Sequence, residues 1–160
     1  MRWLRFAVLI LLTTLLQASI NTLPGNKPDF LLILLVFFAI YSSTTDAIIT
    51  SFTIGFAADI ISSAMGPQII SFGVFGVALA YLHRIITIRT VLYQVVTIFI
   101  LSFLTGTLTY LLALIKDQPY PPDRYHILFW TSVYSGIIGP FFFLPCLWWM
   151  RIKTHRFSRH

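Results

Sequence analysis

Long apolar runs separated by short polar stretches dominate the chain. Six runs can be bounded by their polar or proline-bearing interruptions, at about residues 4–20, 29–41, 46–62, 69–86, 90–115 and 127–150. An apolar run of about 17–25 residues is long enough to cross the hydrocarbon core of a bilayer as an α-helix. The pattern therefore predicts an all-α integral membrane protein with six transmembrane helices.

The run at 29–41 fits this reading least well. Its apolar part is close to the 10–14 residues that often mark a partial or re-entrant segment. Counting from Pro28 to Thr45 makes the segment long enough to cross. The sequence leaves both interpretations open.

Composition supports the membrane class. The 160 residues are 58% hydrophobic and 10% charged, whereas soluble domains are about half apolar and about a quarter charged. With most residues in lipid, a chain of this length has little room for a separate soluble domain. We therefore expect one polytopic membrane domain over residues 1–160, closed by a basic cytoplasmic tail at 151–160.

The basic residues predict the orientation. With six spans, both chain ends lie on the same side of the membrane, and the side with more Lys and Arg is the cytoplasm. Three basic residues fall on the opposite side: Lys27, Lys116 and Arg124. The other eight fall on the side of the chain ends: Arg2, Arg5, Arg84, Arg89, Arg151, Lys153, Arg156 and Arg159. Both termini are therefore predicted to be cytoplasmic.

The net charge of +6 then follows from topology. A nucleic-acid-binding protein would need a basic face on a folded domain, and we expect no nucleic acid partner. The loop with Arg84 and Arg89, and the tail with Arg151, Lys153 and Arg156, are candidates for contact with anionic lipid or with partner proteins.

The first run has a second interpretation, as a cleaved signal peptide. Its Arg-bearing start and apolar core fit that class, but 16-LQASIN-21 is a poor small-x-small cleavage site. Cleavage would leave the remaining topology unchanged, because the next run would still begin outside.

Residues that carry chemistry are few. His83 and His126 lie in different segments, and His155 and His160 in the tail have no Cys pair or carboxylate nearby to complete a metal site. Cys146 is the one cysteine, and no Gly-rich phosphate loop, nucleophile elbow or paired carboxylates occur. The sequence predicts no enzyme, no metal and no cofactor.

Asp59 stands out because it lies inside the apolar stretch 52-FTIGFAADIISSAMG-66. At about 1.5 Å per residue from Asp46 it lies about 20 Å along its helix, in the outer part of the membrane. The side chain could reach outer-face water or one of the outer basic residues, or make a buried polar contact that fixes helix packing. It could also contact a partner or ligand, as intramembrane acids often do. We expect it to anchor the turn at Gly66-Pro67.

Small residues recur at helical spacing and predict close packing of helices in lipid. The run 46–62 carries Ser51 and Gly55, and the next two runs carry the others: Gly73, Gly76, Ala80, Ser102 and Gly106. We expect the runs 46–62, 69–86 and 90–115 to form the tight centre of the bundle. In the last run, Pro140 and Pro145 should each kink the helix.

The order of these signals resembles the family of rod shape-determining proteins named MreD. A basic-Pro stretch leads into an apolar helix at 27-KPDFLLILLVFF-38, and 81-YLHR-84 precedes a basic loop. The third run carries Gly55, Asp59 and Ser62 and is followed by Gly66. The last run carries Trp130, Gly136, Gly139 and Pro140 and is followed by the basic Arg151. The resemblance extends from about Pro28 to Arg151.

This resemblance implies a non-enzymatic scaffold or regulator of the cell-elongation complex, which synthesises peptidoglycan and maintains rod shape. Such proteins lie in the bacterial cytoplasmic membrane. The implied partners are MreC and, through it, MreB, RodA and an elongation-specific penicillin-binding protein. The candidate packing or interaction residues are Gly55, Asp59, Ser62, Gly66, Gly76, Ala80, Gly106, Gly136, Gly139 and Pro140.

The alternative is a substrate-binding membrane component of an energy-coupling-factor vitamin transporter, whose transmembrane bundle is similar to that of the first family. Asn21, Asp59, Gln68 and the aromatic residues of 119-PYPPDRYH-126 could then contact a vitamin. The first run, 6-FAVLILLTTLLQAS-19, lacks the Ala-x-x-x-Ala surface that such components use to dock. An apolar, filled outer cavity would favour the scaffold, and a polar, roomy cavity the binder.

Overall fold

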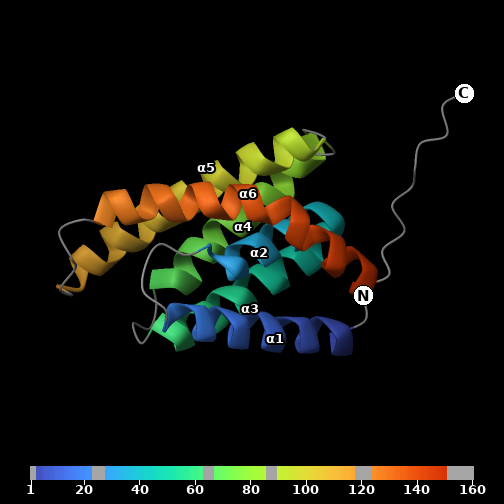
Figure 1. Ribbon diagram of the computed structural model, residues 1–160, viewed down its shortest axis with the longest axis horizontal. Coiled ribbons are helices and arrows are strands. Elements are labelled where there is room, and N and C mark those ends of the chain that lie inside the picture. Colours follow the sequence, from blue (N-terminus) through green and yellow to red (C-terminus); the bar gives the residue numbers. More distant parts are fainter. Residues whose placement is uncertain (1–2, 23–27, 63–66, 86–89, 118–123, 151–160) are drawn as a thin grey trace, which may run out of the picture.

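The computed structural model describes residues 3–22, 28–62, 67–85, 90–117 and 124–150. These residues form six α-helices: α1 (Trp3–Asn21), α2 (Phe30–Tyr41), α3 (Thr44–Ser62), α4 (Pro67–Ile85), α5 (Val91–Ile115) and α6 (Arg124–Met150). The prediction of an all-α protein with six helices is confirmed, and each predicted boundary lies within three residues of the observed one. The helices pack into one elongated bundle (Figure 1).

Five of the six helices are long and apolar enough to cross a membrane, and α2 is the exception. The 12 residues of α2 rise by about 18 Å at 1.5 Å per residue, whereas the hydrocarbon core is about 30 Å thick. The helix cannot be extended to Thr45, because it is capped at Ser42 and α3 begins at Thr44. The reading of this run as a partial segment is therefore correct.

The short helix α2 is the centre of the bundle. Eleven of its twelve residues are buried, and all five other helices pack against it. Figure 1 shows α2 inside the bundle, between α1 and α6. A helix that is apolar on every side is stable only where every side is covered. Aromatic side chains add contacts around it, with the Phe38 ring 4.9 Å from that of Phe6 and the Phe37 ring 5.6 Å from that of Phe143.

The expectation that the runs 46–62, 69–86 and 90–115 form the centre is therefore wrong in part. The first two, α3 and α4, do pack closely. A Cβ atom added at Gly55 of α3 would lie 2.9 Å from the Cα of Ile69 in α4, and one added at Gly76 of α4 would overlap the Ser51 side chain. Ala80 of α4 is also buried. These small residues let the two backbones approach each other.

The third of these runs, α5, packs mainly against α6 and makes no contact with α3 within the described ranges. Gly106 of α5 lies against Leu128 of α6, and Gly139 of α6 lies against Ile98 of α5. The physical reason is that α2 and α4 each pack against both α3 and α5 and so lie between them.

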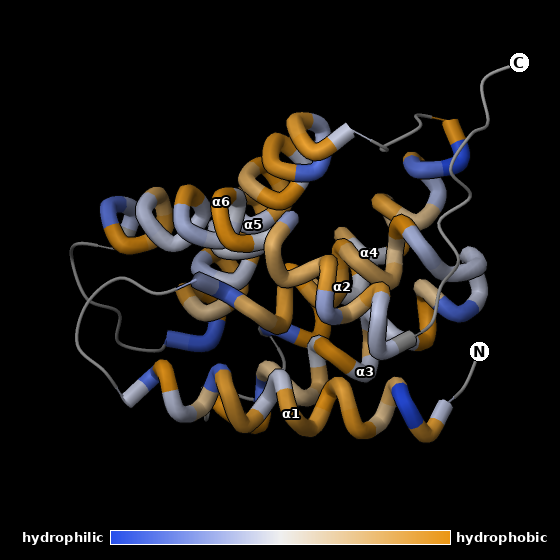
Figure 2. The backbone as a smooth tube through the Cα atoms, turned by 45° about the vertical axis from the view of Figure 1, so that its right-hand side comes forward, coloured by the Kyte–Doolittle hydropathy of each residue, from blue (hydrophilic) through white to orange (hydrophobic). Residues whose placement is uncertain are grey.

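The outer surface of the bundle is apolar, as a lipid environment requires. Large side chains such as Leu92 (68% exposed) and Phe141 (72% exposed) point outward, and hydrophobic residues run along each labelled helix (Figure 2). Trp3 and Trp148 are exposed at one end of the bundle, and Tyr125 is exposed at the other. The chain is thus a multi-pass membrane protein with aromatic residues near both predicted interfaces.

The first and last helices meet at one end of the bundle. The indole Nε1 of Trp149, near the end of α6, donates a hydrogen bond to the Arg5 carbonyl oxygen at 3.2 Å. Pro140 and Pro145 lie inside α6, and the helix changes direction in its C-terminal half (Figure 1). Proline removes a backbone donor and commonly bends a helix in this way.

Candidate functional site

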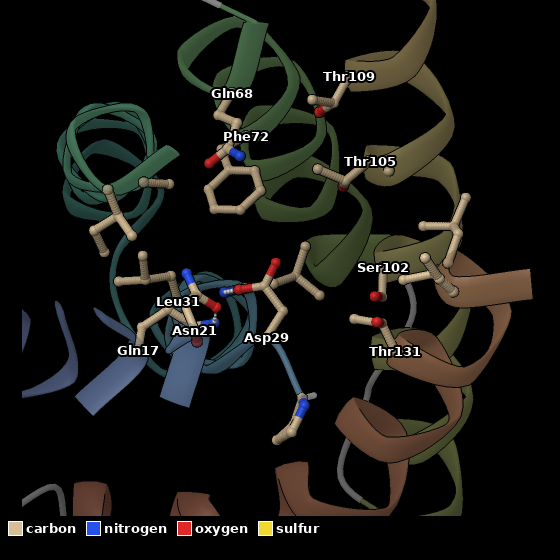
Figure 3. Close-up of a pocket in the computed structure, with 17 residues that line it drawn as sticks. Gln17, Asn21, Asp29, Leu31, Gln68, Phe72, Ser102, Thr105, Thr109 and Thr131 are labelled. Atoms are coloured by element: carbon tan, nitrogen blue, oxygen red, sulfur yellow. Dashed lines mark hydrogen bonds between the residues drawn. The ribbon is translucent and has the colours of Figure 1, made fainter. Parts of the chain in front are cut away.

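A cavity of about 380 Å³ lies at the end of the bundle where α1, α3 and α5 end and where α2, α4 and α6 begin. It lies over the N-terminus of α2, because this helix is shorter than the helices around it. Figure 3 shows side chains from several helices converging on the cavity. Its lining consists of Gln17, Asn21, Pro28, Asp29, Leu31, Leu32, Ala58, Ile61, Gln68, Phe72, Ser102, Thr105, Gly106, Thr109, Ile127, Leu128 and Thr131.

The corner between α1 and α2 is built from polar side chains. The Gln17 Oε1 atom accepts a hydrogen bond from the Phe30 backbone N–H at 2.9 Å, and its Nε2 donates to Asn21 Oδ1 at 3.2 Å. Asp29 is the N-cap of α2, and its Oδ1 accepts from the Leu32 N–H at 3.1 Å. These bonds satisfy backbone donors that the first turn of a helix leaves without partners. They also fix the positions of Gln17 and Asp29 beside the cavity.

The start of α4 is held by Asp59. This side chain is 1% exposed, and its two carboxylate oxygens accept hydrogen bonds from the backbone N–H groups of Gln68 at 3.1 Å and Ile69 at 3.0 Å. Among the three interpretations of Asp59, the structure shows the buried polar contact that fixes helix packing. The interpretation that Asp59 reaches water at the outer face is wrong, because the side chain is buried.

Asp59 was also expected to anchor the turn at Gly66-Pro67. Its hydrogen-bond donors, Gln68 and Ile69, are the two residues after Pro67. Gly66 itself lies outside the described part of the chain. Asp59 does not line the cavity, but it positions the backbone of Gln68, whose side chain does.

The α5 wall of the cavity carries three hydroxyl groups on one helix face. Thr109 Oγ1 donates to Ser71 Oγ at 3.0 Å, and Ser102 Oγ accepts from Ser132 Oγ at 3.3 Å. Thr105 lies between them and is 3% exposed, and its Oγ1 has no hydrogen-bond partner within the described part of the protein. A buried hydroxyl group without a partner is unfavourable, and such groups are rare in folded proteins.

Apolar side chains complete the lining. Phe72 of α4 and Leu31 of α2 border the polar groups, and Figure 3 shows Phe72 next to Gln68 and Leu31 next to Asn21. Asp29 is the one ionisable group among the lining residues within the described ranges. The cavity is therefore amphipathic, with neutral hydrogen-bonding groups and one carboxyl group. A cavity that is polar and roomy, as this one is, favours ligand binding over a purely structural role.

The sequence-derived candidates are only partly brought together here. Gly106 lines the cavity, as do Asn21 and Gln68. Gly55, Gly76, Ala80, Gly136, Gly139 and Pro140 lie elsewhere in the bundle. Arg84 is exposed in the last turn of α4, at the opposite end of that helix from the cavity.

Several candidates lie outside the described residues. Ser62 ends α3, and its side chain lies outside the described residues, as do all of Gly66, Arg89, Arg151, Lys153 and Arg156. The part of the chain that the structure describes contains no cluster of three or more His, Cys, Asp or Glu residues that could hold a metal ion.

The residues that sequence reasoning missed are Gln17, Asp29, Thr105, Thr109 and Thr131. The sequence did contain a signal for the two threonines of α5. Ser102, Thr105 and Thr109 are spaced three and four apart in an apolar run, so they form a polar stripe on one face of a helix. A polar stripe on a transmembrane helix indicates a protein-facing or cavity-facing side.

Comparison with known proteins gives the family. Neither the curated proteins nor the solved structures include a match to the chain. The family model for rod shape-determining protein MreD matches residues 1–153, nearly the whole chain of 160 residues. Together with the six-helix membrane architecture, this match shows that the chain belongs to the MreD family of rod shape-determining proteins.

Proposed function

We propose that this protein is a non-enzymatic scaffold or regulator of the complex that synthesises peptidoglycan during cell elongation. The observation that carries the proposal is the family match over residues 1–153, since that family takes part in determining rod shape. The architecture agrees with such a role. Nearly all of the described chain is helical, and the cavity residues that the structure describes include no nucleophile paired with a base.

The proposed location is the cytoplasmic membrane, with both chain ends in the cytoplasm. The distribution of eight basic residues against three supports this orientation. The chain passes from one end of the bundle to the other in each of its six helices, including α2, although α2 is shorter than the hydrocarbon core. The contact between Trp149 and Arg5 brings the start of α1 and the end of α6 to the same end of the bundle, as six passes require. In this orientation the cavity opens toward the outer side. Arg84 lies at the cytoplasmic end of α4, where it can contact anionic lipid.

The proposed partner is MreC and, through it, MreB, RodA and an elongation-specific penicillin-binding protein. These partners follow from membership of the family. A bitopic partner would add at least one helix against the apolar outer surface of the bundle, where exposed side chains such as Phe141 pack equally well against lipid or protein.

Co-purification tests this proposal. The full chain, carrying an affinity tag and expressed at its native level in its own host, is extracted in mild detergent. We expect MreC to be recovered with it in near-stoichiometric amount. A tagged polytopic membrane protein of unrelated function, extracted in parallel, is the control. Recovery of MreC at the level of that control would contradict the proposal.

The transporter alternative is favoured by one observation, the polar and roomy cavity. The family match gives it no support. Ligand binding in this cavity would therefore be a property of a shape-determining protein, in addition to its role in the elongation complex.

A further inference from the structure

We propose that the cavity over the N-terminus of α2 binds a small amphipathic amine. Its ammonium group would contact Asp29 and Thr105, and its apolar body would lie against Phe72 and Leu31. This inference goes beyond the scaffold role, because it assigns a ligand site to the interior of the bundle.

The size and position of the cavity support binding. Its volume of about 380 Å³ lies within the range of about 300–1,000 Å³ typical of small-molecule sites. Two lining residues at the rim, Asn21 and Ile127, are exposed, whereas Gln17 and Thr109 farther in are buried. A molecule can therefore enter from the end of the bundle and still lose most of its contact with water.

Thr105 points to a polar ligand atom. Its hydroxyl group is buried and without a hydrogen-bond partner within the described ranges, although its neighbours Ser102 and Thr109 on the same helix face both have one. Thr105 also lines the cavity (Figure 3). A donor on a bound molecule would satisfy the Thr105 oxygen, and an ammonium group has three donors.

Asp29 determines the preferred charge. Among the lining residues that the structure describes, Asp29 is the one ionisable residue, and none of them is Lys, Arg or His. Its carboxylate accepts the Leu32 N–H at 3.1 Å, and a carboxylate can accept about four hydrogen bonds in total. In a site that excludes water, attraction between unlike charges is stronger than in bulk solvent. The lining therefore favours a cation over an anion.

The polar and apolar groups lie on different parts of the lining. Asp29 and Gln17 come from the corner of α1 and α2, and Thr105 comes from α5, whereas Phe72 and Leu31 present apolar surface. Such an arrangement fits a molecule with one polar end and one apolar end, and it leaves the apolar groups in contact with apolar atoms.

The test is protection of a cysteine in the cavity from a thiol reagent. In a Cys146→Ala background, Thr131→Cys places a reporter on the lining, and 2-aminoethyl methanethiosulfonate modifies it in membranes that hold the full chain. The probes are octylammonium and octanoate, which have the same apolar chain and opposite charges. We expect octylammonium to slow the modification of Thr131→Cys and octanoate to have little effect.

Matched variants connect protection to the proposed contacts. Asp29→Asn keeps a good helix cap but removes the charge, and it should raise the octylammonium concentration needed for half-protection by about tenfold or more. Thr105→Val keeps the shape and removes the hydroxyl group, and it should raise that concentration about fivefold. Thr107→Val is the control, because Thr107 bonds to the Phe103 carbonyl oxygen and does not line the cavity.

Tyr125→Cys, an exposed site on the first turn of α6, reports on general effects of the probes. If Tyr125→Cys reacts while Thr131→Cys does not, and a second reporter at Ser102→Cys is also silent, the proposal is overturned. Equal protection by octanoate would overturn it as well. Unchanged protection in Asp29→Asn would show that the amine does not bind at the proposed contacts, and it would also overturn the proposal.

Discussion

Asp59 illustrates, at the scale of single residues, how an acidic side chain is accommodated inside an apolar bundle. The sequence allowed its depth along the helix to be estimated, because the rise per residue of an α-helix is fixed. Its partners could not be derived, because they depend on how α4 returns against α3. In the structure, the carboxylate accepts the N–H groups of Gln68 and Ile69. Asp59 thus accepts hydrogen bonds from the first turn of α4.

We predict that Asp59→Ala destabilises the protein more than Asp59→Asn does. Alanine leaves the N–H groups of Gln68 and Ile69 without this acceptor, at a cost of about 1–3 kcal/mol for each group that stays buried. Asparagine keeps one acceptor oxygen and should lose less. The measurement is the temperature at which half of the purified protein has aggregated in detergent.

Asp117→Asn is the matched control for this series. Asp117 is exposed and has a φ of 52°, a conformation that asparagine tolerates well. Its substitution should leave the aggregation temperature unchanged. An Asp59→Ala protein that aggregates at the wild-type temperature would show that the two hydrogen bonds contribute little to stability.

The residues of the cavity show the limit of sequence reasoning at this scale. Asn21 and Gln68 were proposed as ligand contacts because they are polar and lie near the outer ends of helices. Asp29 was read only as part of a family motif, because the sequence does not show that α2 begins below the ends of its neighbours.

At the scale of helices, α2 is the most informative element. Its sequence is apolar on every side, so hydrophobic periodicity could not distinguish a membrane span from a buried helix. Its length of 12 residues and its burial by five neighbouring helices show that α2 is a buried helix. The other five helices were predicted well, because each is bounded by polar or proline-rich stretches. Of the contacts between helices, those of α4 with α3 and with α5 were predicted, and both are present.

The contact between α3 and α4 gives a prediction at this scale. Gly55→Ala should destabilise the protein by about 1–3 kcal/mol, because the new methyl group would lie 2.9 Å from the Cα and 3.2 Å from a carbonyl oxygen of the α4 backbone. Backbone atoms cannot move aside without shifting the whole helix. The same thermal aggregation measurement detects this loss.

Gly136→Ala is the matched control in α6. Its new Cβ would meet its nearest neighbour at 3.4 Å, an ordinary contact distance. Alanine also favours the helical state by about 1 kcal/mol over glycine. We expect no loss of stability here. If Gly55→Ala and Gly136→Ala behaved alike, close backbone packing of α3 on α4 would not be the reason for glycine at position 55.

At the scale of the whole molecule, the arrangement of charges predicts the topology. Alkaline phosphatase is active only outside the cytoplasm, so a fusion after Asp117 should be active and a fusion after His160 inactive. The physical reason is the excess of basic residues on the side of the chain ends. The opposite pattern of activity would invert the orientation and place the cavity on the cytoplasmic side.

The central claim is that this membrane protein maintains rod shape as part of the elongation complex. The most direct measurement is cell width by microscopy after the protein is depleted in its own host, with a plasmid-borne wild-type copy as the rescue control. We expect depleted cells to widen and become spherical, and the wild-type copy to restore rods of normal width. Depleted cells that keep growing as rods of unchanged width would contradict the account.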